Sequence, residues 1–354
     1  MPALSDILSE LAALSGNLDA QQSWPNEQFK LLGRAGALAW VIPAEYGGSE
    51  ISQRDLLAGY VDLASACLTT TFVLTQRNGA CQRIAASPNE ALKSRLLPQL
   101  ARGELFATVG ISHLTTSRQH LKQPAVRAFE ETGGYRLDGE VPWVTGAAHA
   151  DFIVTGGTLE DGRQLLAAVP ARQAGVFVDP PARLLALSAS HTSSMRLENV
   201  LVERELIVAG PIEQVMRQRA ASTGSLGTSA LAAGLSRAAL DRLAAEAHAR
   251  PDLVPILDPL REECAWLISA LESASDEGTQ TRDPELSSEA IRARANSLAL
   301  RSTQALLAAS KGAGFVSGHF AERAVREAMF FLVWSCPQPV VHAALRELAG
   351  LGTC

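Results

Sequence analysis

The sequence is poor in aromatic residues and in charge of either sign. Aromatic side chains make up 5% of its 354 residues and charged side chains 19%, and the formal net charge is −6. A nucleic-acid-binding protein would show a strongly basic patch, so this balance argues against a nucleic acid as partner. No run reaches about 18 uncharged apolar residues, so we expect no membrane insertion.

Paired cysteines and clustered histidines are absent as well. The seven histidines lack the His-x-x-x-His spacing of metal sites, so no metal is expected. The first residues, MPALSDILSELAALSG, have neither the basic start nor the apolar core of a secretory signal. An odd number of scattered cysteines is typical of a reducing compartment, and we therefore expect a cytoplasmic protein. The five cysteines are Cys67, Cys81, Cys264, Cys336 and Cys354.

Hydrophobic residues make up 47% of the chain, and their pattern changes twice along it. Residues 1–104 show helical spacing. Residues 105–210 carry short apolar or alternating runs punctuated by Gly, Asp and Pro, which is typical of antiparallel strands. Residues 211–354 are helical again, beginning with a long helix over 212–249. The sequence predicts an α+β fold with an N-terminal helical domain, a middle antiparallel β domain and a C-terminal four-helix bundle. The lack of βαβ alternation argues against a doubly wound fold.

Five short motifs follow one another along these three regions. Together and in this order they resemble the motifs of the acyl-CoA dehydrogenase family, which has the same three-part organisation. The resemblance implies FAD bound between the β domain and the bundle, a small-molecule or acyl-thioester substrate, and a homodimer or homotetramer. The motifs are IPAEYGG (Ile42–Gly48), LLPQLARGE (Leu96–Glu104), YRLDGEVPWVTGAAHADFIV (Tyr135–Val154), AAGLSRAALD (Ala232–Asp241) and KGAGFVSGHFAERAVREA (Lys311–Ala328).

Three residues form the expected flavin contact. A flavin ring needs a flat apolar wall and a few polar atoms at its edges. Trp143 and Thr145 would lie on the same face of a strand, and the resemblance places both against the flavin. It also assigns to Ser112 a hydrogen bond with the flavin edge. The alternative for Trp143 is an ordinary core residue.

Three further residues are expected near the other end of the cofactor. The resemblance implies that Arg250 reaches the pyrophosphate held by a neighbouring subunit; otherwise it is a solvated arginine at a helix end. Gly312 and Gly314 would let the backbone approach a phosphate or an adenine closely. The alternative for these glycines is a helix C-cap.

The residue expected to act as catalytic base is missing. The family's dehydrogenation removes a proton next to a thioester and requires a carboxylate with a raised pKa. Counting nine residues on from Arg326, in the motif like the family's Arg-Asp-Ala, leads to Ser335, directly after Trp334. The other position used in the family falls within STGSLGTSA (Ser222–Ala230), which contains no carboxylate. The catalytic residues therefore stay unassigned.

Other departures leave three functions open. SHLTTSRQ (Ser112–Gln119) lacks the glycines of the family's corresponding run, and His113 stands where the family has a glutamate, as a structural histidine or as a contact for a flavin–oxygen adduct. Cys336 is either a redox thiol or a small buried side chain. The hypotheses are a flavin oxidoreductase with a reaction other than standard α,β-dehydrogenation, a flavin-dependent monooxygenase, and a non-catalytic binding or assembly protein with a decayed pocket.

Overall fold

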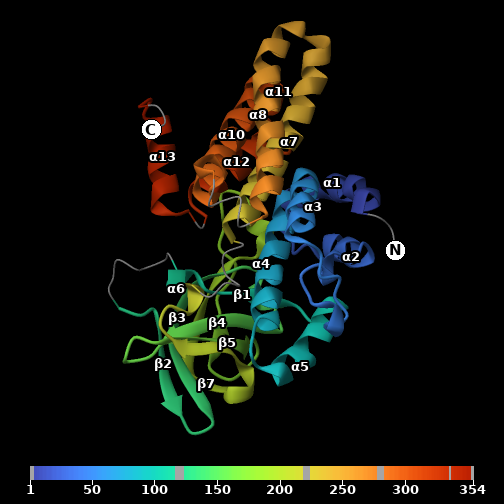
Figure 1. The fold of residues 1–354 in the computed structure, drawn as a ribbon. Helices are drawn as coiled ribbons and strands as arrows, with labels where there is room; N and C mark the ends of the chain where they lie inside the picture. Colours follow the sequence, from blue (N-terminus) through green and yellow to red (C-terminus); the bar gives the residue numbers. More distant parts are fainter. Residues whose placement is uncertain (1–3, 116–122, 218–223, 277–282, 335, 352–354) are drawn as a thin grey trace.

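The computed structural model describes residues 4–115, 123–217, 224–276, 283–334 and 336–351, and it confirms the α+β fold class (Figure 1). The N-terminal region is helical. Ser52 caps the third helix by accepting a hydrogen bond from the amide of Asp55, and Asn89 caps the fifth through the amide of Leu92. The helices are α1 (Leu4–Gln21), α2 (Asn26–Arg34), α3 (Gln53–Ala66), α4 (Leu68–Ala85) and α5 (Glu90–Ala101).

The middle region forms one sheet, but the sheet is mixed rather than purely antiparallel. Its order is β6-β7-β3-β2-β4-β5-β8, with β1 added beside β4. The strands joined by tight turns, β2–β3 and β4–β5, are antiparallel as predicted. β1 and β4 run parallel because a long excursion separates them, so no hairpin fixes their directions. The strands are β1 (Ala107–Val109), β2 (Val126–Glu131), β3 (Gly134–Val144), β4 (Phe152–Thr158), β5 (Gln164–Pro170), β6 (Val176–Val178), β7 (Ser193–Glu203) and β8 (Ile207–Ile212).

The C-terminal region is a helical bundle that stands above the sheet in Figure 1. The prediction of a helix from Ile212 was wrong: Ile207–Ile212 pairs with β5 as the last strand, and the helix begins at Gly224. Among the described residues, no helix has the length and apolar character that crossing a bilayer requires. The helices are α7 (Gly224–Ala249), α8 (Val254–Ala274), α10 (Ser288–Ala309), α11 (Lys311–Gly314), α12 (Phe320–Met329) and α13 (Gln338–Leu348).

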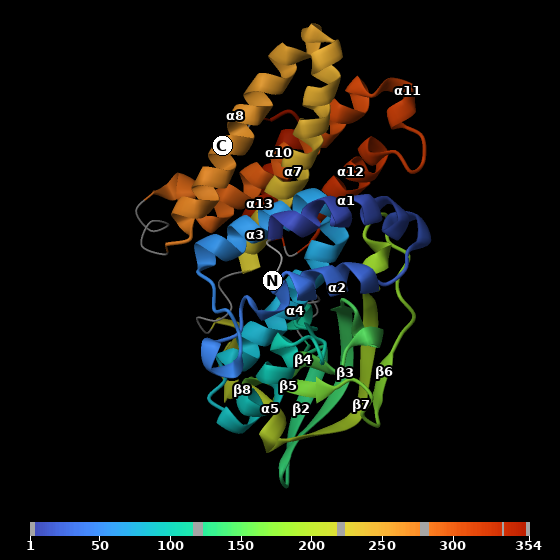
Figure 2. The same cartoon turned by 90° about the vertical axis from the view of Figure 1, so that its right-hand side faces the viewer.

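Helix α4 belongs to two hydrophobic cores. Phe72 and Leu74, in its first half, pack in the core that joins the N-terminal helices to the bundle. Cys81 and Ile84, in its second half, pack in the core that joins α4 and α5 to the sheet. Helix α4 therefore runs between the bundle and the sheet, as Figures 1 and 2 show. The face of α4 between the two cores is free to border a cavity.

Candidate functional site

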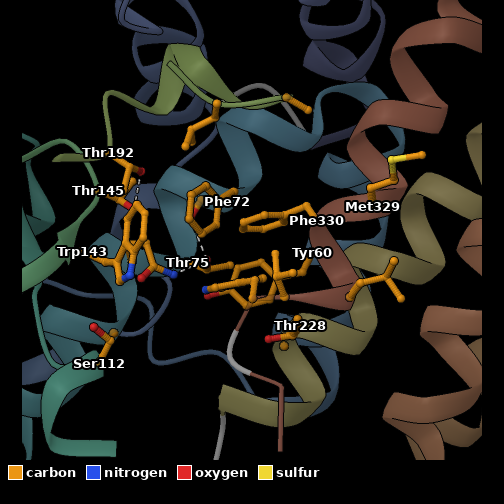
Figure 3. Close-up of a pocket in the computed structure, with 18 of the residues that line it drawn as sticks. Tyr60, Phe72, Thr75, Ser112, Trp143, Thr145, Thr192, Thr228, Met329 and Phe330 are labelled. Carbon is orange, nitrogen blue, oxygen red and sulfur yellow. Dashed lines mark hydrogen bonds between the residues drawn. The ribbon is translucent and has the colours of Figure 1, made fainter. Parts of the chain in front are cut away.

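A cavity of about 1210 Å³ lies where the two cores separate. This volume is at or above the upper end of small-molecule sites, roughly 1,000 Å³, so the cavity has room for a large ligand. Helices α3, α4, α7, α10 and α12 border it, together with the ends of β1 and β3. Residues that define its walls include Tyr60, Phe72, Thr75, Gln76, Arg83, Ser112, Trp143, Thr145, Thr192, Thr228, Met329, Phe330 and Trp334. Figure 3 shows most of these side chains.

The structure brings the three expected flavin-contacting residues to the cavity wall. Trp143 is 51% exposed, so it is a wall residue and not a core residue. Thr145 lies beside it in Figure 3. Its Oγ1 is 3.0 Å from Oγ1 of Thr192, which fixes the hydroxyl at the end of β3. Ser112 Oγ is shielded from solvent and has no hydrogen-bond partner among the described residues, so the described chain leaves this polar atom unsatisfied.

An aromatic cluster forms another part of the wall. Trp334 stacks on Phe330 with ring centroids 4.9 Å apart and meets Phe72 edge-on at 4.8 Å. These contacts join the segment after α12 to α4. Ser335, the position of the missing base, lies outside the described residues. Trp334, the residue that precedes Ser335 in the sequence, lines the cavity.

A buried arginine holds the backbone of this segment. Arg292 of α10 donates from Nη2 to the carbonyl oxygen of Trp334 at 2.8 Å and from Nε to Oδ1 of Asn296 at 2.9 Å. Asn296 donates in turn to the carbonyl oxygen of Phe331. Burial raises the pKa of the neighbouring Cys336 thiol although Arg292 opposes the rise. The thiol therefore stays protonated, which favours a small packed side chain over a redox role.

No described residue that lines the cavity is an aspartate, a glutamate or a histidine. Arg83 and Arg326 are the charged residues in the part of the lining that the structure describes. Arg326 is neutralised by Asp19 at 2.8 Å and by Glu322 at 2.8 Å. His113 points elsewhere: its Nε2 is 3.0 Å from the carbonyl oxygen of Gly156, as suits a structural histidine. The described lining thus offers no group that could act as a general base of the family's kind.

Arg250, Gly312 and Gly314 are not among the described lining residues. Helix α7 has Thr228 at the cavity and ends just before Arg250, about 33 Å further along its axis. Arg250 donates to Glu246 and to the carbonyl oxygen of Ala309, beside the turn that holds both glycines. A Cβ on Gly314 would lie 2.6 Å from Cβ of Ser310, so packing explains this glycine. Gly312 faces open space.

The sequence analysis missed three residues that line this cavity. Phe72 and Arg83 come from α4, and Thr192 from the start of the segment that leads into β7. Helix α4 carries two arginines and no acidic residue, a pattern that could have drawn attention to it. Nothing local in the sequence distinguishes Phe72 from any other core residue. In the part of the chain that the structure describes, no group of His, Cys, Asp or Glu is arranged to hold a metal.

Helices, then a sheet, then a bundle, arranged around one cavity at their junction, define an acyl-CoA dehydrogenase-type fold. The sequence model of the family 'acyl-CoA dehydrogenase, N-terminal domain' matches residues 7–104 of this chain. A probable acyl-CoA dehydrogenase of Bacillus subtilis is 26% identical over 252 residues, which cover 68% of this chain and 65% of that protein. The match therefore spans slightly less than two thirds of that relative's length.

Solved structures agree with this assignment over nearly the whole chain. Butyryl-CoA dehydrogenase from Megasphaera elsdenii superimposes with a TM-score of 0.83 at 16% identity, covering 99% of both chains. A glutaryl-CoA dehydrogenase in complex with glutaryl-CoA gives 0.82 at 18% identity, covering 99% of this chain and 95% of that one. Residues 7–104 therefore match the acyl-CoA dehydrogenase N-terminal domain, and the chain as a whole has the acyl-CoA dehydrogenase fold, which confirms the resemblance seen in its motifs.

A buried carboxyl group beside the site should make stability depend on pH. Burial raises the pKa of Glu327 in α12 to about 7, and Arg323, with Nε 3.7 Å from Oε1, only partly opposes this. The folded protein then keeps a proton that the unfolded chain releases above the ordinary glutamate pKa, so stability falls as the pH rises from 5 to 7. Glu327→Gln removes this loss.

We expect the unfolding free energy of Glu327→Gln, relative to the unmodified protein, to rise by about 2 kcal/mol between pH 5 and pH 7. Urea denaturation of both proteins at the two pH values measures it. Glu322→Gln is the control: burial would raise the pKa of Glu322, but the bonds from Arg326 and from the amide of Gly318 outweigh it and lower the pKa. Glu322 is then ionised in the folded and the unfolded chain throughout this range, so the difference for this variant should hardly change between pH 5 and pH 7. A difference for Glu327→Gln that does not change with pH would contradict the buried, protonated state.

Proposed function

We propose that the protein is an FAD-dependent oxidoreductase of this family that does not carry out the usual α,β-dehydrogenation of acyl thioesters. The observation that carries the proposal is the cavity itself. It presents Trp143, Thr145 and the unpartnered hydroxyl of Ser112 on one wall, yet no described lining residue is an Asp or a Glu. A flavin would find a flat apolar surface and polar edge contacts, while proton abstraction from a thioester lacks its carboxylate.

The residues present fit a flavin. The Trp143 indole would cover one face of the ring, and the hydroxyls of Ser112 and Thr145 would bind its polar edge. When bound, FAD supplies a two-electron acceptor. Arg250, Gly312 and Gly314 would serve the adenine and pyrophosphate end of a cofactor held by a second copy of the chain, because α7 carries Arg250 away from its own Thr228. This supports a homodimer or homotetramer.

The backbone that leads to the expected base position is held in place, but the residue at that position is a serine and not a carboxylate. Arg292 and Asn296 hold the backbone from Phe331 to Trp334, and the Trp334 ring remains in the cavity wall. Ser335 therefore follows an aromatic residue, as the family's base does, but its hydroxyl has no described carboxylate or histidine in the cavity lining to activate it. A reaction that needs no such base, such as flavin-dependent oxygenation, is compatible with this wall and is the second candidate.

The absorbance spectrum of the purified protein, with FAD added and with butyryl-CoA under anaerobic conditions, tests the proposal. We expect a bound flavin spectrum that butyryl-CoA does not bleach. Ser335→Glu is the informative variant: bleaching only in this variant shows that the pocket is otherwise competent for the family reaction. Rapid bleaching of the unmodified protein contradicts the proposal. A protein that takes up no FAD points to the non-catalytic hypothesis, and oxygen-dependent turnover with a reductase points to the monooxygenase.

A further inference from the structure

Helix α4 carries two arginines in different situations. Arg77 is fully buried, and its guanidinium donates to the backbone carbonyl oxygens of Leu38 and Leu100. It therefore ties α4 to the segments on either side and has a structural role. Arg83, later on the same helix, lines the cavity. It donates from Nη1 to the carbonyl oxygen of Gly79 at 2.8 Å, one turn back on its own helix.

The described chain does not neutralise Arg83. Its Nε atom is shielded from solvent and has no hydrogen-bond partner among the described residues. Burial lowers the pKa of the guanidinium to about 10, and no carboxylate in the described part of the chain compensates for the lost hydration. A cation that is partly removed from water without a partner costs stability. The described partners of Arg83 therefore do not account for a charged side chain at this position.

Arg83 packs over a glycine and has no carboxylate beside it in the described cavity lining. A Cβ on Gly79 would lie 3.3 Å from Nη1 of Arg83 and 3.6 Å from Val109, so the absent side chain leaves space for the guanidinium between α4 and β1. Gln82, the preceding residue, also lines the cavity. Among the charged lining residues described, Arg326 already has two carboxylate partners. Of the two described arginines in the lining, Arg83 is thus the one without a carboxylate partner.

We propose that Arg83 binds an anionic oxygen group of the substrate, either a carboxylate on the acyl chain or a phosphate on the carrier of that chain. A guanidinium offers paired donors that match both groups, and charge-assisted hydrogen bonds of this kind are among the strongest in proteins. The proposal rests on the proposed function in taking acyl thioesters as the substrate class. It concerns binding and adds no chemical step.

Equilibrium binding to full-length Arg83→Gln and to the unmodified protein tests this, with valeryl-CoA, glutaryl-CoA and coenzyme A as probes. Valeryl and glutaryl chains have the same length and differ in the terminal carboxylate. Loss of roughly ten-fold or more in affinity for glutaryl-CoA alone identifies an acyl carboxylate. Equal losses for all three probes identify a carrier phosphate. Arg83→Lys keeps the charge and should recover part of the lost affinity.

Other outcomes overturn the proposal. The first is that the unmodified protein binds none of the probes. The second is that Arg83→Gln changes the affinity for each of the three probes by less than two-fold. The third is that Arg83→Gln loses affinity for FAD, which would assign the residue to the cofactor. FAD uptake by the unmodified protein is measured separately, so failure of the proposed function is told apart from failure of this inference.

Stability gives a second readout, with Arg77 as the matched control. Arg77→Gln should lower the urea midpoint, since it leaves two buried carbonyl oxygens unpaired. Arg83→Gln should leave the midpoint unchanged or raise it. If Arg83→Gln lowers the midpoint as much as Arg77→Gln does, Arg83 is structural and the proposal fails.

Discussion

Trp143→Ala should weaken FAD binding roughly 30-fold or more, which corresponds to about 2 kcal/mol. The indole is 51% exposed on the cavity wall, and a flavin ring laid against it would remove that apolar surface from water. Because the side chain is half exposed in the free protein, its truncation should cost little folding stability. The loss should therefore appear in binding and not in the unfolding midpoint. Titration of the apoprotein with FAD, followed by flavin fluorescence, measures it.

The control for this variant is another half-exposed aromatic residue of the same sheet. Phe177 in β6 is 45% exposed, is not among the described lining residues and lies beneath the Arg196 guanidinium at 5.1 Å. Phe177→Ala should leave FAD affinity within two-fold. Trp143→Phe, which keeps a smaller ring, should fall between the unmodified protein and Trp143→Ala. Equal affinities for Trp143→Ala and Phe177→Ala would remove Trp143 from the flavin site.

Gly234→Ala should lower the free energy of unfolding by about 3 kcal/mol. Gly234 lies where α7 crosses α3, and a Cβ there would be 2.5 Å from the carbonyl oxygen of Val61 and 2.7 Å from Cβ of Ala64. One of these atoms is backbone, so the helices must move apart to accept even a methyl group. This crossing joins the N-terminal helices to the bundle. An ion pair between Arg237 of α7 and Asp62 of α3, at 2.7 Å, lies at the same crossing. Urea denaturation measures the loss.

Gly227→Ala on the same helix should have the opposite sign. A Cβ at Gly227 would be 3.7 Å from the Tyr60 ring, an ordinary contact. Alanine is favoured over glycine inside a helix by roughly 0.8–1.0 kcal/mol, so this variant should be slightly more stable than the unmodified protein. If both substitutions stabilise the protein, the close crossing of α3 and α7 is wrong.

The pattern of the sequence was sufficient for the fold class. Helical spacing before residue 104 and after the sheet, and alternation between them, reflect which side chains face a core. This spacing is a local property of the sequence, so it can be read without knowing which segments pack against one another. The prediction fails at Ile212 for a non-local reason: IVAGPI pairs with β5 as a strand, and this pairing with a distant segment outweighs the helical tendency of the residues that follow.

Part of the site was equally local. Trp143 and Thr145 belong to one strand end, so their common position on the cavity wall followed from strand geometry. Whether Trp143 was a wall or a core residue could not be known, because its exposed fraction depends on what the bundle and α4 leave uncovered. The same is true of Ser112, whose unpartnered hydroxyl is visible only once all its neighbours are placed.

The sequence by itself therefore determined the three-part architecture, the family motifs and the serine at the base position. Only the tertiary structure decided that α4 lies between two cores and brings Phe72 and Arg83 into the cavity. It also decided that the Arg77 guanidinium bonds two backbone carbonyl oxygens, whereas Nε of Arg83 has no partner among the described residues. The physical reason is that hydrophobic periodicity reflects each residue's own tendency to be buried. Whether a charge has a partner depends instead on residues that are distant in sequence, which only the fold brings near.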